Sequence, residues 1–152
     1  MPTHAEQKVL PYTPAQMFDL VADVEKYPQF LPWCLACRIK KRESDTVFLA
    51  DLVIGYKFVR EKFTSRVNLT PGRAIRVEYL DGPMRQLSNE WDFIENPDGS
   101  CTIDFYVDFE FHNPLFQKLM GLFFNEAVRR MVSAFELRAE RLYGPKTATP
   151  PA

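Results

Sequence analysis

Alternating apolar and polar residues predict a β-sheet in the middle of the chain. The clearest strand covers 101–111, where every odd-numbered residue is apolar and the residues between them are mostly polar. Four more stretches with β-strand character cover 46–54, 57–69, 73–80 and 86–93. Short turns rich in Gly, Pro, Asn and Asp separate most of these strands, so the sheet should be antiparallel and meandering.

A helical period replaces the alternation on both sides of the predicted sheet. Thr13 can cap a helix with Pro14 at its first position, and this helix should run to about Ala22. Asn113 can cap a second helix that runs to about Tyr143, a length of about 43 Å at 1.5 Å per residue. Between the first helix and the sheet, residues 23–33 favour a short helical turn followed by an ordered loop.

The long C-terminal helix has one apolar face and one polar face. The apolar stripe runs from Phe116 to Phe135, and the opposite face includes Arg129 and Glu136. Such a helix needs a sheet to lie on, and the preceding sheet has one apolar face to offer. The pattern therefore predicts an α+β fold in which a curved antiparallel sheet wraps the C-terminal helix.

The composition of the chain is that of one globular domain. We expect this domain to cover residues 1–144, with a disordered tail at 145–152, where Pro, Thr, Lys and Ala dominate. A net charge of -1 gives no broad electrostatic surface for nucleic acid, so DNA is not an expected partner. Aromatic residues make up 14% of the chain, which suits a large core or an apolar ligand cavity.

We expect no targeting segment at the start of the given sequence, unless it is a processed form. Its first eight residues lack the apolar run of a secretory signal, and no stretch approaches the roughly 20 apolar residues of a membrane span. We expect a cytoplasmic protein. Residues 115–124 are apolar on nearly all sides, more than packing on a sheet requires, so this segment is also a candidate for peripheral contact with the inner membrane.

The residues of common catalytic and metal sites are sparse. Cys34 and Cys37 have the spacing of a redox motif, but the strand–helix context of a thioredoxin-like site is missing. Four zinc ligands would need Cys101, His4 and His112 as well, and the two histidines are expected in a tail and a loop. We therefore expect no catalytic residue, no metal and no cofactor other than a bound ligand.

Three polar residues are expected on the apolar face of the sheet. Strand parity directs Glu61 inward with Ser65 and Phe63, and Asn89 shares the inward face of its own strand. Buried polar groups need partners, so Glu61 and Asn89 are candidates for contacts to the head group of a ligand. The alternative for Glu61 is a solvated strand end or a bulge that reverses the parity.

Several segments resemble the coenzyme Q-binding family of START-like proteins, which is grouped with the polyketide cyclases and dehydrases. The resemblance extends from about Lys8 to Tyr143, and its most specific part is the string Tyr27-Pro28-Gln29-Phe30-Leu31-Pro32-Trp33-Cys34. It also rests on Phe63–Val67, Asp81-Gly82-Pro83 with Leu87, Trp91-Asp92-Phe93, and Phe135–Ala139.

The resemblance implies a helix-grip fold with about seven strands around the C-terminal helix. It also implies a hydrophobic tunnel that binds ubiquinone or a related isoprenoid lipid and supports respiration without catalysis. A bacterial relative described as a toxin that blocks the association of ribosomal subunits keeps a ribosome-linked role open as a less favoured alternative. A cyclase-like enzyme, with Glu61 or Tyr79 as acid or base, is the other alternative.

The pattern and the resemblance together select a set of residues for the ligand pocket. Apolar residues on the inward face of the strands and the long helix are expected to line it, with Trp33 at its mouth. This set consists of Trp33, Phe63, Leu87, Trp91, Phe105, Val107, Leu119, Phe123 and Ala127.

Overall fold

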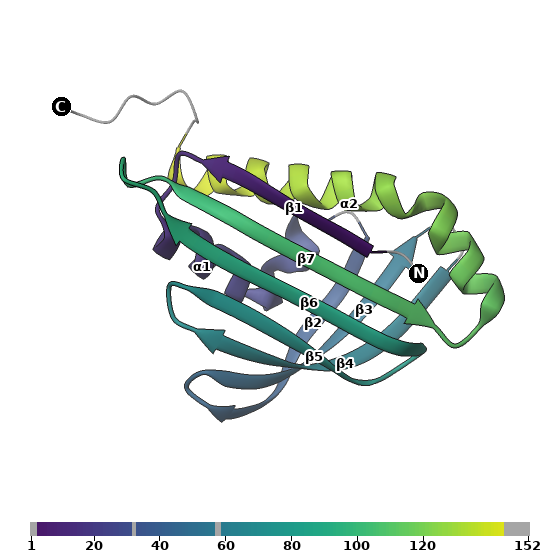
Figure 1. Cartoon of the computed structure of the whole chain (residues 1–152). Coiled ribbons are helices and arrows are strands. Elements are labelled where there is room, and N and C mark those ends of the chain that lie inside the picture. Colours follow the sequence, from purple (N-terminus) through teal and green to yellow (C-terminus); the bar gives the residue numbers. More distant parts are fainter. Residues whose placement is uncertain (1–2, 32, 57–58, 145–152) are drawn as a thin grey trace.

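A seven-stranded antiparallel sheet curves beneath one long helix. The computed structural model describes residues 3–31, 33–56 and 59–144. The strand order is β1-β7-β6-β5-β4-β3-β2, and helix α2 lies across the concave face (Figure 1). The elements are β1 (Thr3–Leu10), α1 (Pro14–Ala22), the 3-10 helix η1 (Val24–Gln29), β2 (Cys34–Ser44), β3 (Val47–Tyr56), β4 (Val59–Thr70), β5 (Ala74–Asp81), β6 (Met84–Glu95), β7 (Cys101–Phe111) and α2 (Pro114–Tyr143). This is the predicted helix-grip architecture. The tail expected at 145–152 lies outside the described residues.

The predicted caps define the ends of both α-helices. The Thr13 side chain accepts a hydrogen bond from the backbone N–H of Gln16, and the Gln16 side chain accepts one from the backbone N–H of Thr13. At the start of α2 the Asn113 side chain accepts a hydrogen bond from the N–H of Leu115. Gly144 follows the last turn of α2 with a φ of 104°, a conformation in which a side chain would be strained.

The two edge strands are additions to the predicted pattern. Strand β1 pairs with β7, and β2 pairs with β3. The inner side of β1 carries the half-buried His4, Glu6 and Lys8, so no apolar alternation marks this strand. The expectation that His4 lies in an N-terminal tail is therefore wrong, because its ring packs 6.1 Å from that of Phe105.

The polar side of α2 also needs one correction. Glu136 was expected on the outer face of the helix, but its side chain is only 15% exposed and forms an ion pair with Lys8 of β1. The helix thus meets the edge of the sheet through charges and the centre of the sheet through apolar groups. His112 is exposed beside the start of α2, as the sequence predicted.

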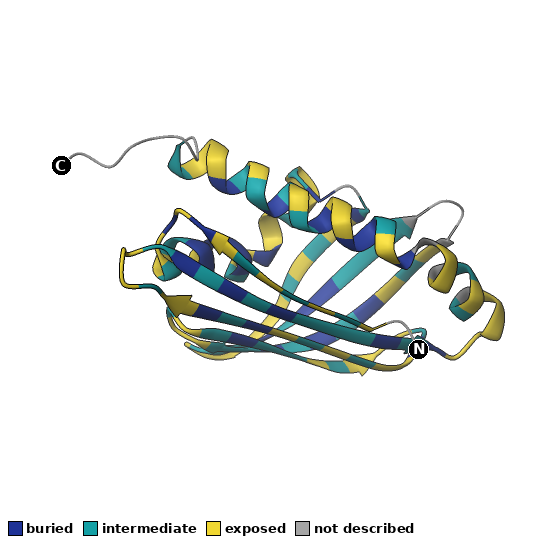
Figure 2. Cartoon of the chain, turned by 45° about the horizontal axis from the view of Figure 1, so that its top comes forward, coloured by how far each residue is buried: buried dark blue, intermediate teal, exposed yellow. Residues whose placement is uncertain are grey.

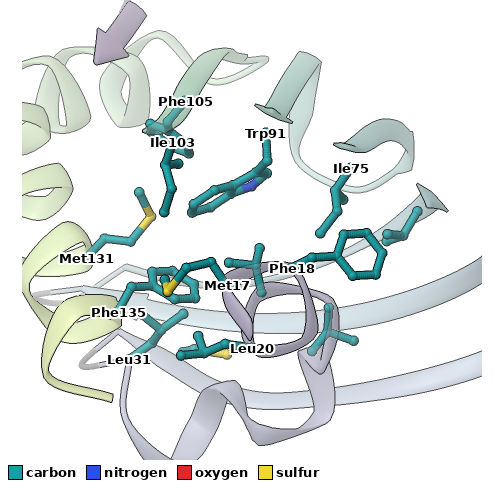
Figure 3. Close-up of a cluster of buried hydrophobic side chains, with 14 of the residues drawn as sticks. Met17, Phe18, Leu20, Leu31, Ile75, Trp91, Ile103, Phe105, Met131 and Phe135 are labelled. Atoms are coloured by element: carbon teal, nitrogen blue, oxygen red, sulfur yellow. The ribbon is translucent and has the colours of Figure 1, made fainter. Parts of the chain in front are cut away.

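The hydrophobic core lies between the concave face of the sheet and the two α-helices. Trp91 of β6 is its centre, with ring centroids 4.6 Å from Phe105 of β7 and 5.2 Å from Phe135 of α2. Figure 3 shows Met17 and Phe18 of α1 in the same cluster of buried side chains. This packing holds the second half of α2 against the sheet.

The convex face of the sheet is polar and holds a buried carboxylate. Asp51 of β3 is 6% exposed because the side chains that bind it cover it. The Thr64 hydroxyl donates a hydrogen bond to Asp51 over 2.6 Å, and the Arg38 guanidinium donates another over 3.0 Å. These hydrogen bonds hold the pKa of the Asp51 carboxyl below its usual range. Because Arg38 itself is largely exposed, this cluster has the weak energetics of a surface network.

The first turns of α2 are much more exposed than the rest of the helix (Figure 2). Leu115 is 61% exposed and Leu122 is 70% exposed, whereas Met131, Phe135 and Ala139 in the second half are buried. Within the described ranges, no helix combines the length and the apolar character that crossing a membrane requires.

Candidate ligand cavity

An apolar cavity of about 230 Å³ lies between the sheet, α2 and the segment around η1. Most of the residues predicted for the pocket line it, and they come from five separate parts of the chain. They are Trp33 after η1, Phe63 of β4, Leu87, Asn89 and Trp91 of β6, Phe105 and Val107 of β7, and Ala127 of α2. The inward parity of the strands therefore placed these side chains correctly.

Two predicted residues do not line this wall, and a third has a side chain outside the described residues. Leu119 is half-buried in the first part of α2 and does not belong to the lining. The side chain of Phe123 lies outside the described residues, so its place in the pocket stays a prediction. Glu61 is half-buried in β4 opposite Ile54, near the β3–β4 turn, and it does not line the cavity either.

Sequence reasoning missed the contribution of the segment before the sheet. Val21 of α1, Val24 and Tyr27 of η1, and Leu31 close one side of the cavity. Their signal was present as a helical turn and an ordered loop rich in apolar residues, but no pattern indicated which way the loop folds. The Tyr27 hydroxyl donates a hydrogen bond to the Val21 carbonyl, which ties this segment to α1.

Trp33 connects this segment to both walls of the cavity. Its indole N–H donates a hydrogen bond to the carbonyl of Ala127 in α2 over 3.4 Å. Its backbone carbonyl accepts one from the N–H of Gly55 in β3 over 2.9 Å. The residue predicted for the mouth thus joins the helix to the sheet at the border of the cavity.

The turn between β5 and β6 packs directly on the cavity wall. Gly82 has a φ of 147°, and a Cβ there would come within 2.5 Å of the Cβ of Phe63. Only glycine allows this approach, and the turn supports the lining residue from behind. On the other side of this turn, the hydroxyl of Tyr79 in β5 accepts a hydrogen bond from the backbone N–H of Met84 over 2.9 Å.

Two polar side chains stand out among the lining residues, Asn89 and Ser65. The Asn89 amide donates to the carbonyl of Tyr106 over 3.0 Å, and its oxygen accepts from the indole N–H of Trp91 over 3.0 Å. Asn89 therefore fixes the orientation of Trp91 from inside the cavity. Ser65 is 6% exposed and lines the wall in the middle of β4.

The surroundings of Cys34 and Cys37 do not favour redox chemistry. Cys34 and Cys37 lie in β2 as free thiols, without the helix N-terminus that activates a redox cysteine. Burial raises the pKa of the Cys34 thiol to about 11 and that of Cys37 to about 12. Both stay protonated near neutral pH. The described residues contain no group of three or more His, Cys, Asp or Glu side chains that could hold a metal ion.

Comparison with known proteins assigns the chain to one family. The profile of the family described as "Polyketide cyclase / dehydrase and lipid transport" matches residues 10–136. An 18 kDa protein of Caulobacter crescentus, solved in solution, superposes with a TM-score of 0.77 at 36% identity, covering 95% of this chain and 100% of that one. Both findings agree with the fold described above.

Two similar proteins carry names from different fields of biology. The ribosome association toxin RatA of Pseudomonas aeruginosa is 37% identical over 145 residues, covering 95% of this chain and all of that protein. The mitochondrial coenzyme Q-binding protein COQ10 homolog B of Xenopus laevis is also 37% identical over 145 residues, covering 93% of this chain. The match spans 59% of the length of the Xenopus protein.

Proposed function

Because the chain belongs to the polyketide cyclase / dehydrase and lipid transport family, we propose that it binds ubiquinone or a related isoprenoid lipid in its cavity. It would serve as a carrier that supports respiratory electron transport and performs no chemistry on its ligand. The observation that supports this most is the cavity itself, which is closed by α2 and walled by aromatic and aliphatic side chains. The similarity to a protein named as coenzyme Q-binding points the same way.

The physical reason for such a carrier is the cost of an isoprenoid tail in water. Exposed apolar surface costs about 25 cal/mol per Å², and a cavity lined by apolar groups removes that cost without forming or breaking bonds. Trp91, Phe105 and Phe63 offer flat faces to a ring or to an unsaturated chain. A quinone has both of these parts.

The chemistry of the lining supports binding over catalysis. Among the described residues that line the cavity there is no carboxylate, imidazole, ammonium or guanidinium group to act as acid or base. Glu61 and Tyr79 were the alternatives for an acid or base in the sequence, but neither is part of this wall, and burial raises the pKa of the Tyr79 hydroxyl. The phenol of Tyr27 and the thiol of Cys37 also line the cavity, but burial raises the pKa of both, and the Tyr27 hydroxyl is bound to the Val21 carbonyl.

Tryptophan fluorescence can test the proposal directly. The chain has two tryptophans, Trp33 and Trp91, and both line the cavity. A short-chain prenylated benzoquinone should therefore quench the emission with a saturable binding curve. Leu87→Lys should abolish saturation, because it places a charge in the apolar wall of β6. Ile94→Lys is the matched control, since Ile94 belongs to the same strand and is 47% exposed.

Loss of saturation in the Ile94→Lys variant, or saturation retained in a folded Leu87→Lys variant, would place the ligand elsewhere. Far-UV circular dichroism shows whether each variant is folded. If the wild type gives no saturable quenching, the carrier function itself is wrong.

Delivery of the lipid would take place at a membrane surface. Leu115 and Leu122 expose their side chains at the start of α2, next to the part of the helix that closes the cavity. An interfacial helix binds in proportion to the apolar area that it inserts. Insertion of these turns would bring the cavity to the lipid phase.

A ribosome-linked role is the second candidate, supported by the similarity to a ribosome association toxin. The edge strand β2 carries Lys40, Lys41 and Arg42 in succession, all exposed. Such a cluster suits phosphate contacts. If this role holds, the protein should sediment with ribosomal subunits in a sucrose gradient, and Lys40→Glu with Lys41→Glu should release it. Sedimentation of the protein apart from both subunits would exclude the role.

A further inference from the structure

The wall of the cavity contains one hydroxyl that no described residue binds. Two polar residues are buried within the described part of the chain, Asp51 and Ser65. Asp51 faces the convex side and is bound by Thr64 and Arg38. Ser65 faces the cavity, and no described residue forms a hydrogen bond with its side chain.

The Ser65 oxygen is open to the cavity. No buried side-chain nitrogen or oxygen among the described residues lacks a hydrogen-bond partner. The Ser65 oxygen has no such partner, so it must lie at the cavity surface although the residue is only 6% exposed. When an apolar ligand fills the cavity, this hydroxyl loses access to water, and it stays unsatisfied unless the ligand accepts its hydrogen bond. The Ser65 hydroxyl is therefore a polar point that matches a ligand with an acceptor atom.

Ser65 lies in a recess of the wall. Along β4 it is flanked by the bulkier Phe63 and Val67, both inward and buried. Its direct neighbour across the sheet in β3 is Ala50, which also lines the cavity. Ala50 and Ser65 are both small, so they leave a space in the wall, and the larger Phe63 and Val67 border that space. The recess can therefore receive a group with one polar atom and flat apolar faces.

Asn89 provides a second polar point on the same wall. Ser65 pairs with Tyr79 of β5, and Asn89 pairs with Val77 of the same strand, so the two residues are two strands apart. Two strand spacings of about 4.8 Å, and an offset of two residues along the strand at about 3.4 Å each, separate their backbones by roughly 12 Å. One Asn89 N–H is bound to the Tyr106 carbonyl, and an amide has a second N–H. The pair suits a ring that carries oxygen atoms on opposite sides.

The size of the cavity indicates which end of the ligand it holds. An apolar cavity of about 150 Å³ is sufficient for benzene. The cavity of about 230 Å³ therefore accommodates one ring and a short part of a chain, and a longer isoprenoid tail would have to leave it. Since the polar points lie on the inner wall, the ring end of the ligand is the part that matches the cavity.

We infer that Ser65 is the head-group anchor: its hydroxyl donates a hydrogen bond to a ring carbonyl of a quinone-type ligand seated in the Ala50–Ser65 recess. The ligand enters ring first, and its tail extends out of the cavity. Asn89 is the second polar contact, and Glu61 takes no part in holding the ring. This inference rests on the proposed lipid-binding function and specifies the orientation of the ligand.

Two probes separate the hydrogen bond from the shape of the cavity. The first is a short-chain prenylated benzoquinone, and the second is the same chain on a benzene ring without oxygen. Ser65→Ala should weaken binding of the quinone roughly 3- to 10-fold, the effect of one lost hydrogen bond. It should leave binding of the oxygen-free probe unchanged. Ser88→Ala is the control, because Ser88 is an exposed serine next to Asn89 in β6.

The outcomes distinguish the inference from the proposed function. Unchanged quinone binding by Ser65→Ala, or equal weakening of both probes, would overturn the role of Ser65 while lipid binding stands. Failure of the wild type to bind either probe would overturn both. Infrared spectra of the quinone bound to wild-type protein give a readout that needs no variant. A carbonyl stretch at lower frequency than in hexane supports the hydrogen bond, and an unshifted pair of carbonyls contradicts it.

Discussion

Replacing Ala127 by Leu should fill part of the cavity and weaken ligand binding while the protein stays folded. Ala127 lines the cavity from α2 and is 9% exposed. Leucine has nearly the helix propensity of alanine, so the substitution leaves the helix itself intact. The perturbation therefore acts on the space inside the cavity.

The structure gives the size of the expected effect. Leucine adds three carbon atoms to Ala127, and each buried methylene contributes about 0.8 kcal/mol. The ligand-free protein gains up to about 2.4 kcal/mol, which strain of about 1–3 kcal/mol from overpacking offsets, so its stability should change little. A ligand displaced from the same space loses about 2.4 kcal/mol. This corresponds to a roughly 50-fold weaker Kd.

Tryptophan quenching by a short-chain prenylated benzoquinone measures the Kd, and urea unfolding measures the stability. Ala134→Leu is the matched control, since it makes the same change on the same helix at a half-buried position outside the cavity lining. Binding by Ala127→Leu as tight as that of the wild type, with unchanged unfolding, would show that the ligand does not occupy this cavity.

Three further changes test separate parts of the structure. Asp51→Asn should lower the free energy of unfolding by roughly 1 kcal/mol at pH 7. Because the folded pKa of Asp51 is lowered, its contribution is present above the unfolded pKa of about 3.9 and is lost as the pH falls through the folded pKa. Cys37 should react slowly with iodoacetamide at pH 7.5, since burial raises its pKa to about 12. Leu115→Ser with Leu122→Ser should reduce flotation with liposomes, whereas Leu137→Ser, an equally exposed change later in α2, should not.

Each of these expectations can fail visibly. Urea curves of Asp51→Asn that differ from those of the wild type by the same amount at pH 7 and pH 2 would refute the ionic contribution. Alkylation of Cys37 at the rate of a free thiol in solution would contradict its burial. Wild-type protein that never floats with liposomes would point to a protein acceptor for the lipid.

The centre of the fold could be predicted because its residues have two distinct faces. In β7 every second residue is apolar and faces α2, so strand parity alone places Phe105 and Val107 in the cavity. The edge strands could not be found in this way. The inner side of β1 holds His4, Glu6 and Lys8, whose burial depends on the ion pair and ring contacts with other elements.

The polar part of the site shows the same limit. Sequence parity directed both Glu61 and Ser65 inward, and the carboxylate was the more conspicuous of the two. The structure separates them by position along β4: Ser65 lies at mid-strand opposite the small Ala50, and Glu61 lies near the end, away from the cavity lining. The difference comes from the curvature of the sheet and from the neighbour across the strand, which local periodicity does not encode.

Mass spectrometry of the lipids extracted from the purified protein tests the central claim most directly. Protein produced in a quinone-making host should yield a prenylated quinone or a similar isoprenoid lipid at a substoichiometric level, and Leu87→Lys protein should yield none. Ile94→Lys protein, purified in parallel, should carry as much as the wild type. Extracts of folded wild type that contain only the phospholipids found equally with Leu87→Lys would contradict the proposal that the cavity carries an isoprenoid lipid.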